Sequence, residues 1–253
     1  MAGALVGTVA LVTGASSGIG EATALALAAE GAAVAIAARR RDRLQRLADQ
    51  IGGSGRSLIL ETDVTDEDRV REMVARTVAE FGRLDTLVNN AGVMLLGPIV
   101  AAPTEEWRRM VQLNLLGLLY CTHAGLPHLL EAAASAPRQV ADVVNLSSVA
   151  GRVARQGSGV YNATKFGVGA FSEALRQEVT ARHVRVTIVE PGVVATELVG
   201  HNRPEIQQVI GQTFGAMEPL HPEDIADAVV YAVTRPRHVV LNEFLVRPTE
   251  QER

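Results

Sequence analysis

Residues 9–20 decide the fold: the apolar run Val9-Ala10-Leu11-Val12-Thr13 leads directly into Gly14-Ala15-Ser16-Ser17-Gly18-Ile19-Gly20. A short apolar run of this kind is typical of a strand that is buried on both faces. The glycines allow a tight turn, and the alanine- and leucine-rich residues 18–30 favour a helix. A second apolar run over residues 33–38 completes a strand–helix–strand unit, which predicts a parallel sheet.

The same alternation continues to the end of the chain. Further strands are predicted at 57–61, 86–89, 140–146, 184–189 and 239–246, and helices at 41–51, 66–81, 104–131, 159–181 and from 221. We expect Thr65 to cap the helix at 66–81, and Thr104 to start the long helix after it. The pattern predicts one domain over residues 1–253. Because crossovers between parallel strands are right-handed, we expect a doubly wound, seven-stranded parallel sheet of Rossmann type with helices on both faces.

One irregular segment and the composition narrow the classes of function that the sequence allows. Residues 193–220 hold several glycines and prolines without a clear period, and we expect them to form a flap over the substrate. A net charge of −4 and a pI near 5.9 argue against nucleic acid as a partner. No apolar stretch is long enough to cross a membrane and the N-terminus does not resemble a leader, so we expect a cytoplasmic location. The histidines are dispersed and predict no metal site, and Cys121 sits in an apolar run typical of a core.

The glycine turn predicts a dinucleotide site. In a doubly wound sheet the ligand lies beyond the carboxyl ends of the strands, and residues 14–20 follow the first strand. Glycines there let the backbone approach a pyrophosphate, which the free N–H groups of the next helix can bind. The alternative is a merely tight turn, but the required strand and helix flank this one.

The end of the second strand favours NADP(H). Enzymes that use NAD carry an acid there, whereas this chain has Ala38 followed by Arg39 and Arg40. Guanidinium groups suit the 2′-phosphate of NADP(H) through charge-assisted hydrogen bonds. The alternative for these arginines is the solvated start of the next helix. Asp63, after the third strand, is expected to meet the adenine amino group, and its alternative is a turn residue.

Tyr161 and Lys165 are four residues apart within a predicted helix, and so lie on one of its faces. A nearby ammonium lowers the pKa of a phenol and would make Tyr161 a general acid and base. Taken alone, this spacing also fits an ordinary amphipathic helix.

A series of motifs runs through nearly the whole chain: Thr13-Gly14-x-x-x-Gly18-x-Gly20, Asn89-Asn90-Ala91-Gly92, Asn114, Ser148, Tyr161-x-x-x-Lys165 and Pro191-Gly192. In this order and spacing the sequence resembles the short-chain dehydrogenase/reductase family, in its single-domain branch. Within it, Ala38-Arg39-Arg40, Gly151-Arg152-Val153 and the segments 93–98 and 244–249 are similar to the NADP-dependent clavaldehyde dehydrogenase-type reductases. Ser17 departs from many NADP-using relatives, which carry a basic residue in this turn.

The resemblance implies a catalytic set of Asn114, Ser148, Tyr161 and Lys165. Tyr161 would protonate the carbonyl oxygen, and Ser148 would hydrogen-bond it, while the neighbouring Ser147 would only cap backbone. Lys165 would lower the pKa of the tyrosine and hold the nicotinamide ribose, and Asn114 would support a water chain to Lys165.

The turn, the strand ends and the resemblance together assign these residues to the cofactor: Gly14, Ser16, Ser17, Gly18, Ile19, Gly20, Ala38, Arg39, Arg40, Asp63, Val64, Asn90, Ala91, Gly92, Tyr161, Lys165, Pro191, Gly192, Val194 and Thr196. The function implied is NADPH-dependent reduction of a small aldehyde or ketone, reversible as alcohol oxidation, by a homo-oligomer of two or four chains. The alternative is a catalytically silent NADP-binding sensor or scaffold on the same fold. A nucleotide-sugar epimerase would need a substrate domain for which 253 residues leave little room.

Overall fold

A computed structural model describes residues 3–52, 55–215 and 217–252. Seven strands form one parallel sheet in the order β3-β2-β1-β4-β5-β6-β7, which confirms the predicted doubly wound architecture. The strands are β1 (Val9–Thr13), β2 (Ala33–Ala38), β3 (Ser57–Glu61), β4 (Thr86–Asn89), β5 (Ala141–Leu146), β6 (Val184–Pro191) and β7 (Glu243–Val246). The order reverses between β1 and β4, which is where such sheets place a ligand.

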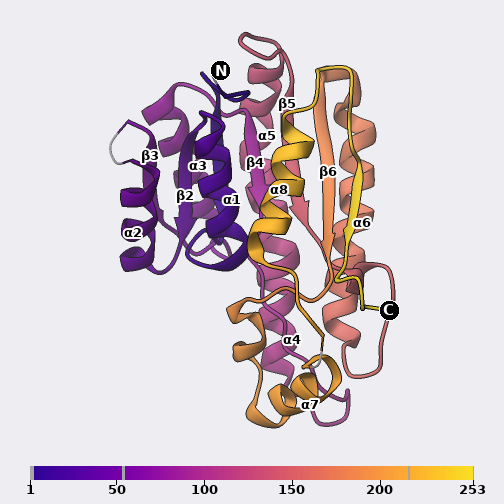
Figure 1. The fold of residues 1–253 in the computed structure, drawn as a ribbon. Helices are drawn as coiled ribbons and strands as arrows, with labels where there is room; N and C mark the ends of the chain where they lie inside the picture. Colours follow the sequence, from indigo (N-terminus) through magenta and orange to yellow (C-terminus); the bar gives the residue numbers. More distant parts are fainter. Residues whose placement is uncertain (1–2, 53–54, 216, 253) are drawn as a thin grey trace.

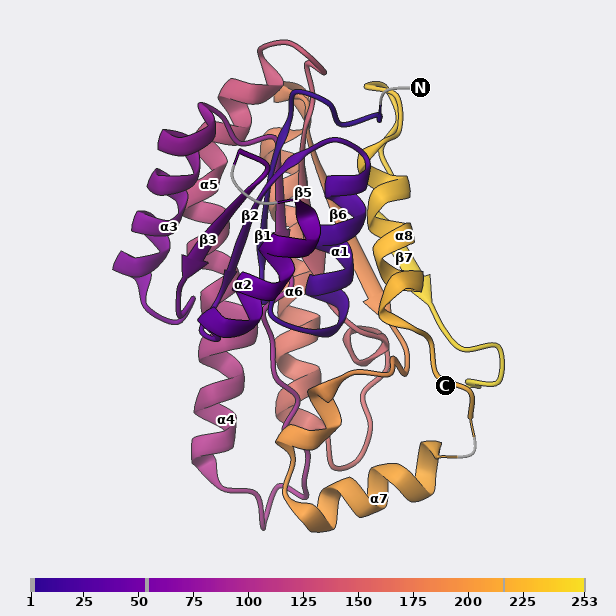
Figure 2. The ribbon, with the colours of Figure 1, turned by 60° about the vertical axis from the view of Figure 1, so that its left-hand side comes forward.

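Helices cover both faces of the sheet (Figures 1 and 2). One face carries α1 (Gly18–Ala29), α2 (Arg41–Ile51) and α8 (Pro222–Val233), and the other carries α3 (Glu67–Phe81), α5 (Gly117–Ala133) and α6 (Gly159–Val179). Strand β2 shows why the apolar runs are continuous: Ile36 packs into the core on the first face, while Ala35 and Ala37 pack into the core on the second. Cys121 is buried in this second core, as predicted, and burial raises the pKa of its thiol to about 12.

The long helix predicted over 104–131 has three parts. It consists of α4 (Thr104–Met110), the π-helical turn η1 (Val111–Leu116) and α5. The side chain of Asn114 in η1 holds both the N–H and the carbonyl of Val93, at 2.8 Å each. A tertiary contact of this kind is invisible to helix periodicity, and single π-helical turns often mark functional sites.

Several other boundaries differ from the sequence prediction by one to four residues, among them the starts of α3 and β7. Asp66, not Thr65, caps α3, because its Oδ1 accepts hydrogen bonds from the N–H groups of Asp68 and Arg69 at 3.1 and 3.2 Å. Strand β7 begins at Glu243, later than the predicted residue 239.

The segment 193–220 is more regular than its glycines and prolines suggest. It holds the 3-10 helix η4 (Glu197–His201) and α7 (Pro204–Phe214), which with α4 extends beyond the carboxyl ends of the strands (Figure 2). Pro204 is tolerated because it stands in the first turn of α7. Asn202 accepts a hydrogen bond from the N–H of Leu96 at 2.7 Å, and Arg203 pairs with Glu106 at 3.1 Å. The segment is therefore tied to the chain that follows β4.

A buried ion pair joins two neighbouring strands near their amino ends. Asp142 of β5 and Arg185 of β6 face each other in register, with Nε–Oδ1 and Nη2–Oδ2 distances of 2.7 and 3.1 Å. Arg185 is 6% exposed and also donates to the carbonyls of Val233, Arg235 and Val239. One guanidinium thus holds β5, β6 and the end of α8 together.

We predict that Arg185→Met lowers the free energy of unfolding by about 3 kcal/mol or more, because it leaves the Asp142 carboxylate buried and only partly compensated. The control is Arg176→Met, which breaks a solvent-exposed pair with Glu173 and should leave the midpoint of urea unfolding nearly unchanged. Equal shifts in the two midpoints would contradict this view of the ion pair between β5 and β6.

Candidate active site

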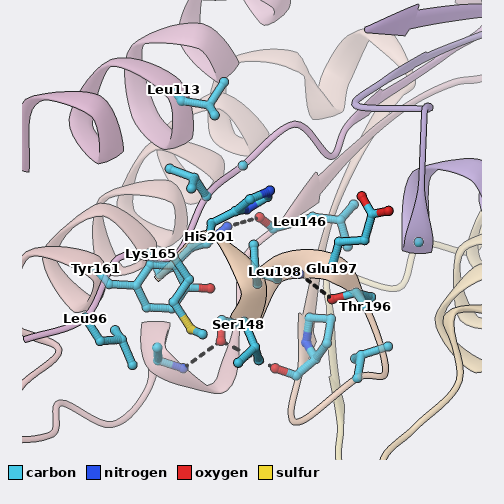
Figure 3. A pocket seen from close by; sticks show the side chains of 18 of the residues that line it. Leu96, Leu113, Leu146, Ser148, Tyr161, Lys165, Thr196, Glu197, Leu198 and His201 are labelled. Carbon is cyan, nitrogen blue, oxygen red and sulfur yellow. Dashed lines mark hydrogen bonds between the residues drawn. The ribbon is translucent and has the colours of Figure 1, made fainter. Parts of the chain in front are cut away.

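One cavity of about 910 Å³ lies beyond the carboxyl ends of the strands (Figure 3). Its wall begins at the turn between β1 and α1, passes the ends of β2, β4, β5 and β6, and ends at η4 and α7. Every residue predicted to contact the cofactor lines this cavity except Gly20, which is buried beneath the turn. Ser148 lines it as well, whereas Asn114 lies behind its wall.

The glycine turn is fixed to β4 by two side chains. The hydroxyl of Thr13 accepts from the N–H groups of Asn90 and Ala91 at 3.0 and 3.2 Å, and the Asn90 amide donates to the carbonyls of Thr13 and Gly14 at 2.9 and 3.2 Å. A Cβ at Gly14 would lie 2.8 Å from the Cα of Ala91, and one at Gly20 would lie 2.4 Å from the Gly14 carbonyl oxygen. Only glycine fits at these two positions, as the close backbone approach predicts.

Beside this turn, the guanidinium of Arg40 and the hydroxyls of Ser16 and Ser17 form a cluster that we call the cationic cradle. The Nη2 of Arg40 donates to the hydroxyls of Ser16 and Ser17 at 3.0 and 2.7 Å, and its Nη1 lies 2.8 Å from the carboxylate of Glu197. Arg39 points elsewhere, 3.9 Å from Asp63 with its side chain 64% exposed. Of the two arginines that the sequence names, Arg40 is therefore the one tied to the glycine turn, and anion binding by either stays a prediction.

Asp63 takes part in a turn in addition to facing the cavity. Its Oδ1 accepts hydrogen bonds from the N–H and the hydroxyl of Thr65, at 3.0 and 2.8 Å. This is the alternative that the sequence left open, and contact with an adenine amino group stays a prediction.

Ser148, Tyr161 and Lys165 meet at the inner end of the cavity (Figure 3). Ser148 follows β5, and its hydroxyl accepts from the N–H of Ala150 at 3.1 Å and bonds the hydroxyl of Tyr161. Tyr161 and Lys165 stand one turn apart on α6, and the lysine Nζ is 5.9 Å from the tyrosine ring centroid. That Nζ donates to the carbonyl of Leu146 at 2.8 Å.

Burial shifts the pKa values of the tyrosine and the lysine apart. It raises the pKa of Tyr161 to about 12, with the Ser148 hydrogen bond acting in the opposite direction, and lowers the pKa of Lys165 to about 8. The sequence predicted that Lys165 would lower the pKa of Tyr161. In the structure the pKa of Tyr161 is raised instead, with loss of hydration as its largest cause, because both side chains are only 7% exposed. Tyr161 consequently keeps its proton at neutral pH, as a proton donor requires.

Ser147 and Asn114 hold the frame of the site. Ser147 is buried and donates to the backbone carbonyl of Lys165 at 3.1 Å, in agreement with a backbone-capping hydroxyl. Asn114 uses its amide on Val93 and lies 3.3 Å from the hydroxyl of Thr164. A water chain from Asn114 to Lys165 stays a prediction.

Comparison with known proteins identifies the family. The sequence model of the short chain dehydrogenase family matches residues 8–207. The chain belongs to this family. It is 42% identical over 251 residues to the glycine betaine reductase ATRR of Emericella nidulans, a match that covers 98% of this chain and 19% of that protein. Because the chain spans about a fifth of that relative, the relative's whole activity is not carried over.

Two solved structures of dehydrogenases share the fold along nearly their full length. The closed form of a serine dehydrogenase complexed with NADP⁺ superposes with a TM-score of 0.89 at 35% identity, covering 97% of each chain. An alcohol dehydrogenase of the archaeon Thermococcus sibiricus, complexed with 5-hydroxy-NADP, gives a TM-score of 0.83 at 29% identity, covering 97% of this chain and 98% of that one. This short-chain dehydrogenase is therefore an oxidoreductase by family, and family members bind NADP.

Sequence reasoning missed several residues of the site. Asn162, inside the Tyr161-x-x-x-Lys165 motif, donates to the carbonyls of Ala150 and Val153 at 2.7 and 3.0 Å and so shapes the loop between β5 and α6. On α7, Ile206, Val209 and Ile210 line the cavity. Their helical spacing is visible in the sequence, but the flanking glycines and prolines concealed it.

Within residues 3–52, 55–215 and 217–252, no group of three or more His, Cys, Asp or Glu side chains could hold a metal ion. None of the helices in the same ranges has the length and apolar character needed to cross a membrane.

Lys165 is the only lysine of the sequence, so its titration can be followed without interference. We predict that the ε-carbon resonance of a chain labelled with ¹³C-lysine titrates with a midpoint near pH 8 in the absence of cofactor. The urea-unfolded chain is the control and should titrate near the free value of about 10.4. A folded midpoint at or above 10 would contradict the desolvation argument.

The lowered pKa of Lys165 also determines the direction in which stability changes with pH. The folded chain gives up the lysine proton near pH 8, whereas the unfolded chain holds it to about pH 10.4. Lys165 therefore lowers the stability of the cofactor-free chain below pH 8, and this cost is relieved as the pH rises from 8 to 10.

Proposed function

We propose that this short-chain dehydrogenase is an NADPH-dependent reductase of an aldehyde or ketone, reversible as an alcohol dehydrogenase. One observation carries the proposal. A single cavity joins the hydrogen-bonded hydroxyls of Ser148 and Tyr161 to the Arg40 cradle. A proton donor for a carbonyl oxygen and a binding site for a 2′-phosphate are thus in one connected space.

The residues present fit the cofactor. The two glycines without room for a Cβ let a pyrophosphate approach the N-terminus of α1, and the Ser16–Ser17–Arg40 cluster suits a 2′-phosphate. Lys165, whose Nζ borders the cavity, would hold the nicotinamide ribose. When bound, NADPH supplies a hydride to the carbonyl carbon.

The chain itself supplies the proton and the orientation. Ser148 would donate a hydrogen bond to the carbonyl oxygen and hold it beside Tyr161. Tyr161 would then give its hydroxyl proton to that oxygen as negative charge develops there. The pKa of about 12 matches this role, because the phenol stays protonated until the oxygen becomes a stronger base. Burial of the Tyr161 side chain limits the access of competing water to the proton donor.

The outer part of the cavity favours a carbonyl with an apolar substituent. Its walls carry Met94, Leu96 and Leu113 from one side and Ile206 and Ile210 from α7. Arg152 and Arg155 lie just past Ser148 in the sequence, where either could grip a substrate carboxylate, and Arg155 lines the cavity. Arg152 is instead engaged by Glu190 and Glu243, with a distance of 2.8 Å from its Nε to Glu190, and does not line the cavity.

The alternative of a catalytically silent NADP sensor is not favoured, since a sensor needs no hydrogen-bonded tyrosine and serine facing the cofactor cavity. The similarity to clavaldehyde dehydrogenase-type reductases, assembly into a dimer or tetramer, a cytoplasmic location and the role of residues 193–220 as a substrate flap stay predictions.

Tyr161→Phe should abolish carbonyl reduction while leaving NADPH binding nearly intact. Loss of general acid catalysis typically costs about 10²–10⁴-fold in turnover, and the Phe side chain keeps the packing of the ring. The matched control is Tyr120→Phe, which removes a hydroxyl from a partly buried tyrosine of α5 outside the cavity. Turnover is measured with NADPH and a panel of aldehydes and ketones. Wild-type turnover in Tyr161→Phe would refute the mechanism.

Arg40→Ala should weaken NADPH binding by about 10- to 100-fold, the scale of one hydrogen bond to a charged group. NADH has no 2′-phosphate and should be affected far less. Arg41→Ala, on an exposed neighbour outside the cavity, serves as the control. Titration of both cofactors by nicotinamide fluorescence decides the point, and equal weakening of both would show that Arg40 does not read the 2′-phosphate.

A further inference from the structure

Glu197 lies against the cationic cradle. It opens η4, directly after Thr196, and reaches back to the start of α2. Its Oε2 is 2.8 Å from Nη1 of Arg40, and its Oε1 is 2.5 Å from Nη1 of Arg43. The same Arg40 guanidinium holds the hydroxyls of Ser16 and Ser17. Figure 3 shows Glu197 and Thr196 on the same side of the cavity.

The chain therefore places its own anion on the cation that a 2′-phosphate would use. A carboxylate between two guanidiniums resembles a bound phosphate in charge and in hydrogen-bond geometry. Hydrogen bonds from Arg40 and Arg43 lower the pKa of Glu197 to about 2, so this carboxylate is ionised at any working pH.

A 2′-phosphate that enters the cradle meets Glu197 in one of two ways. If Glu197 stays, two negative groups share Arg40 and repel each other. If Glu197 leaves, its ion pairs with Arg40 and Arg43 are lost. Both routes weaken the binding of NADPH, and neither affects NADH, which carries a free 2′-hydroxyl.

We propose that Glu197 competes with the 2′-phosphate for Arg40 and so sets how strongly the chain prefers NADPH over NADH. This inference rests on the proposed use of NADPH. Glu197 is a specificity-determining residue that acts through Arg40. Removal of its charge increases the preference for NADPH, and the effect requires the Arg40 guanidinium.

The test is Glu197→Gln, which keeps the shape of the side chain and removes its charge. Dissociation constants of NADPH and NADH are measured by nicotinamide fluorescence at one fixed salt concentration. We expect NADPH to bind about 3- to 10-fold more tightly, the scale of two partly exposed ion pairs, and NADH to change less than about 2-fold. Calorimetry with 2′-AMP and 5′-AMP isolates the phosphate and should show the same difference.

The matched control is Glu205→Gln in α7. Glu205 pairs with Arg203, 3.0 Å away, and has no contact with the cradle. Glu205→Gln shows the effect of losing an acid from residues 193–220 without touching the cradle. We expect the dissociation constants of NADPH and NADH to stay unchanged in this variant. If Glu197 had only a structural role, its loss would change the dissociation constants of NADPH and NADH by the same factor. The ratio of the two dissociation constants is therefore the decisive quantity.

A double-mutant cycle tests the route. In an Arg40→Ala background, Glu197→Gln should no longer change NADPH affinity. Weaker NADPH binding by Glu197→Gln, equal shifts for both cofactors, or an undiminished effect without Arg40 would each overturn the inference. Failure of the proposed function looks different: the wild-type chain would then show no preference for NADPH or no carbonyl turnover, whatever stands at position 197.

Discussion

The hydrogen bonds between Thr13 and Asn90 join the carboxyl ends of β1 and β4, where the strand order of the sheet reverses. At this point the helices that follow the two strands leave on opposite faces, and a crevice opens between them. Without a cross-link, the backbone groups of the turn would be unpaired and its path undefined. Because Thr13 is 1% exposed, each of its bonds is formed away from water and is costly to lose. The cavity and the cradle are both positioned by this junction.

Loss of hydration, more than neighbouring charge, determines the proton chemistry at the other end of the cavity. A shift of about two pKa units in Tyr161 corresponds to about 3 kcal/mol of preference for the protonated phenol. The opposite shift of Lys165 is a cost that the fold carries in order to keep an amine beside the tyrosine. Active sites commonly hold such unfavourable groups, and the surrounding structure offsets them. Here Ser147 and Leu146 supply that support, by bonding the backbone and the ammonium of Lys165.

Sequence pattern predicted the secondary structure correctly where that structure is determined by residues of the same segment. Strands buried on both faces must be continuously apolar, so β1, β2 and β4 have the predicted bounds. Pattern failed where a distant side chain decides. The π-helical turn η1 carries Asn114, whose amide bonds the backbone of Val93, and Arg40 pairs with Glu197, which is 157 residues away in the sequence. Asn90, which the sequence assigns to the cofactor, lines the cavity, and its amide also holds the glycine turn, a second role that the pattern does not reveal.

The arginines show why a count of charges does not identify a ligand site. With 24 basic residues against 28 acidic ones, almost any cavity in this chain will have a guanidinium near it. What differs is how each guanidinium is occupied: Arg185 and Arg152 are committed to buried or half-buried acids, and Arg39 is turned toward Asp63 at the surface. Arg39 lines the cavity as well, but among these four only Arg40 has serine hydroxyls on one side and a half-exposed carboxylate on the other. A charge that is already partly satisfied can exchange partners without first being stripped of water. For that reason a guanidinium paired with a half-exposed acid is better suited to bind and release a phosphate than one that is either free in solvent or locked in the core.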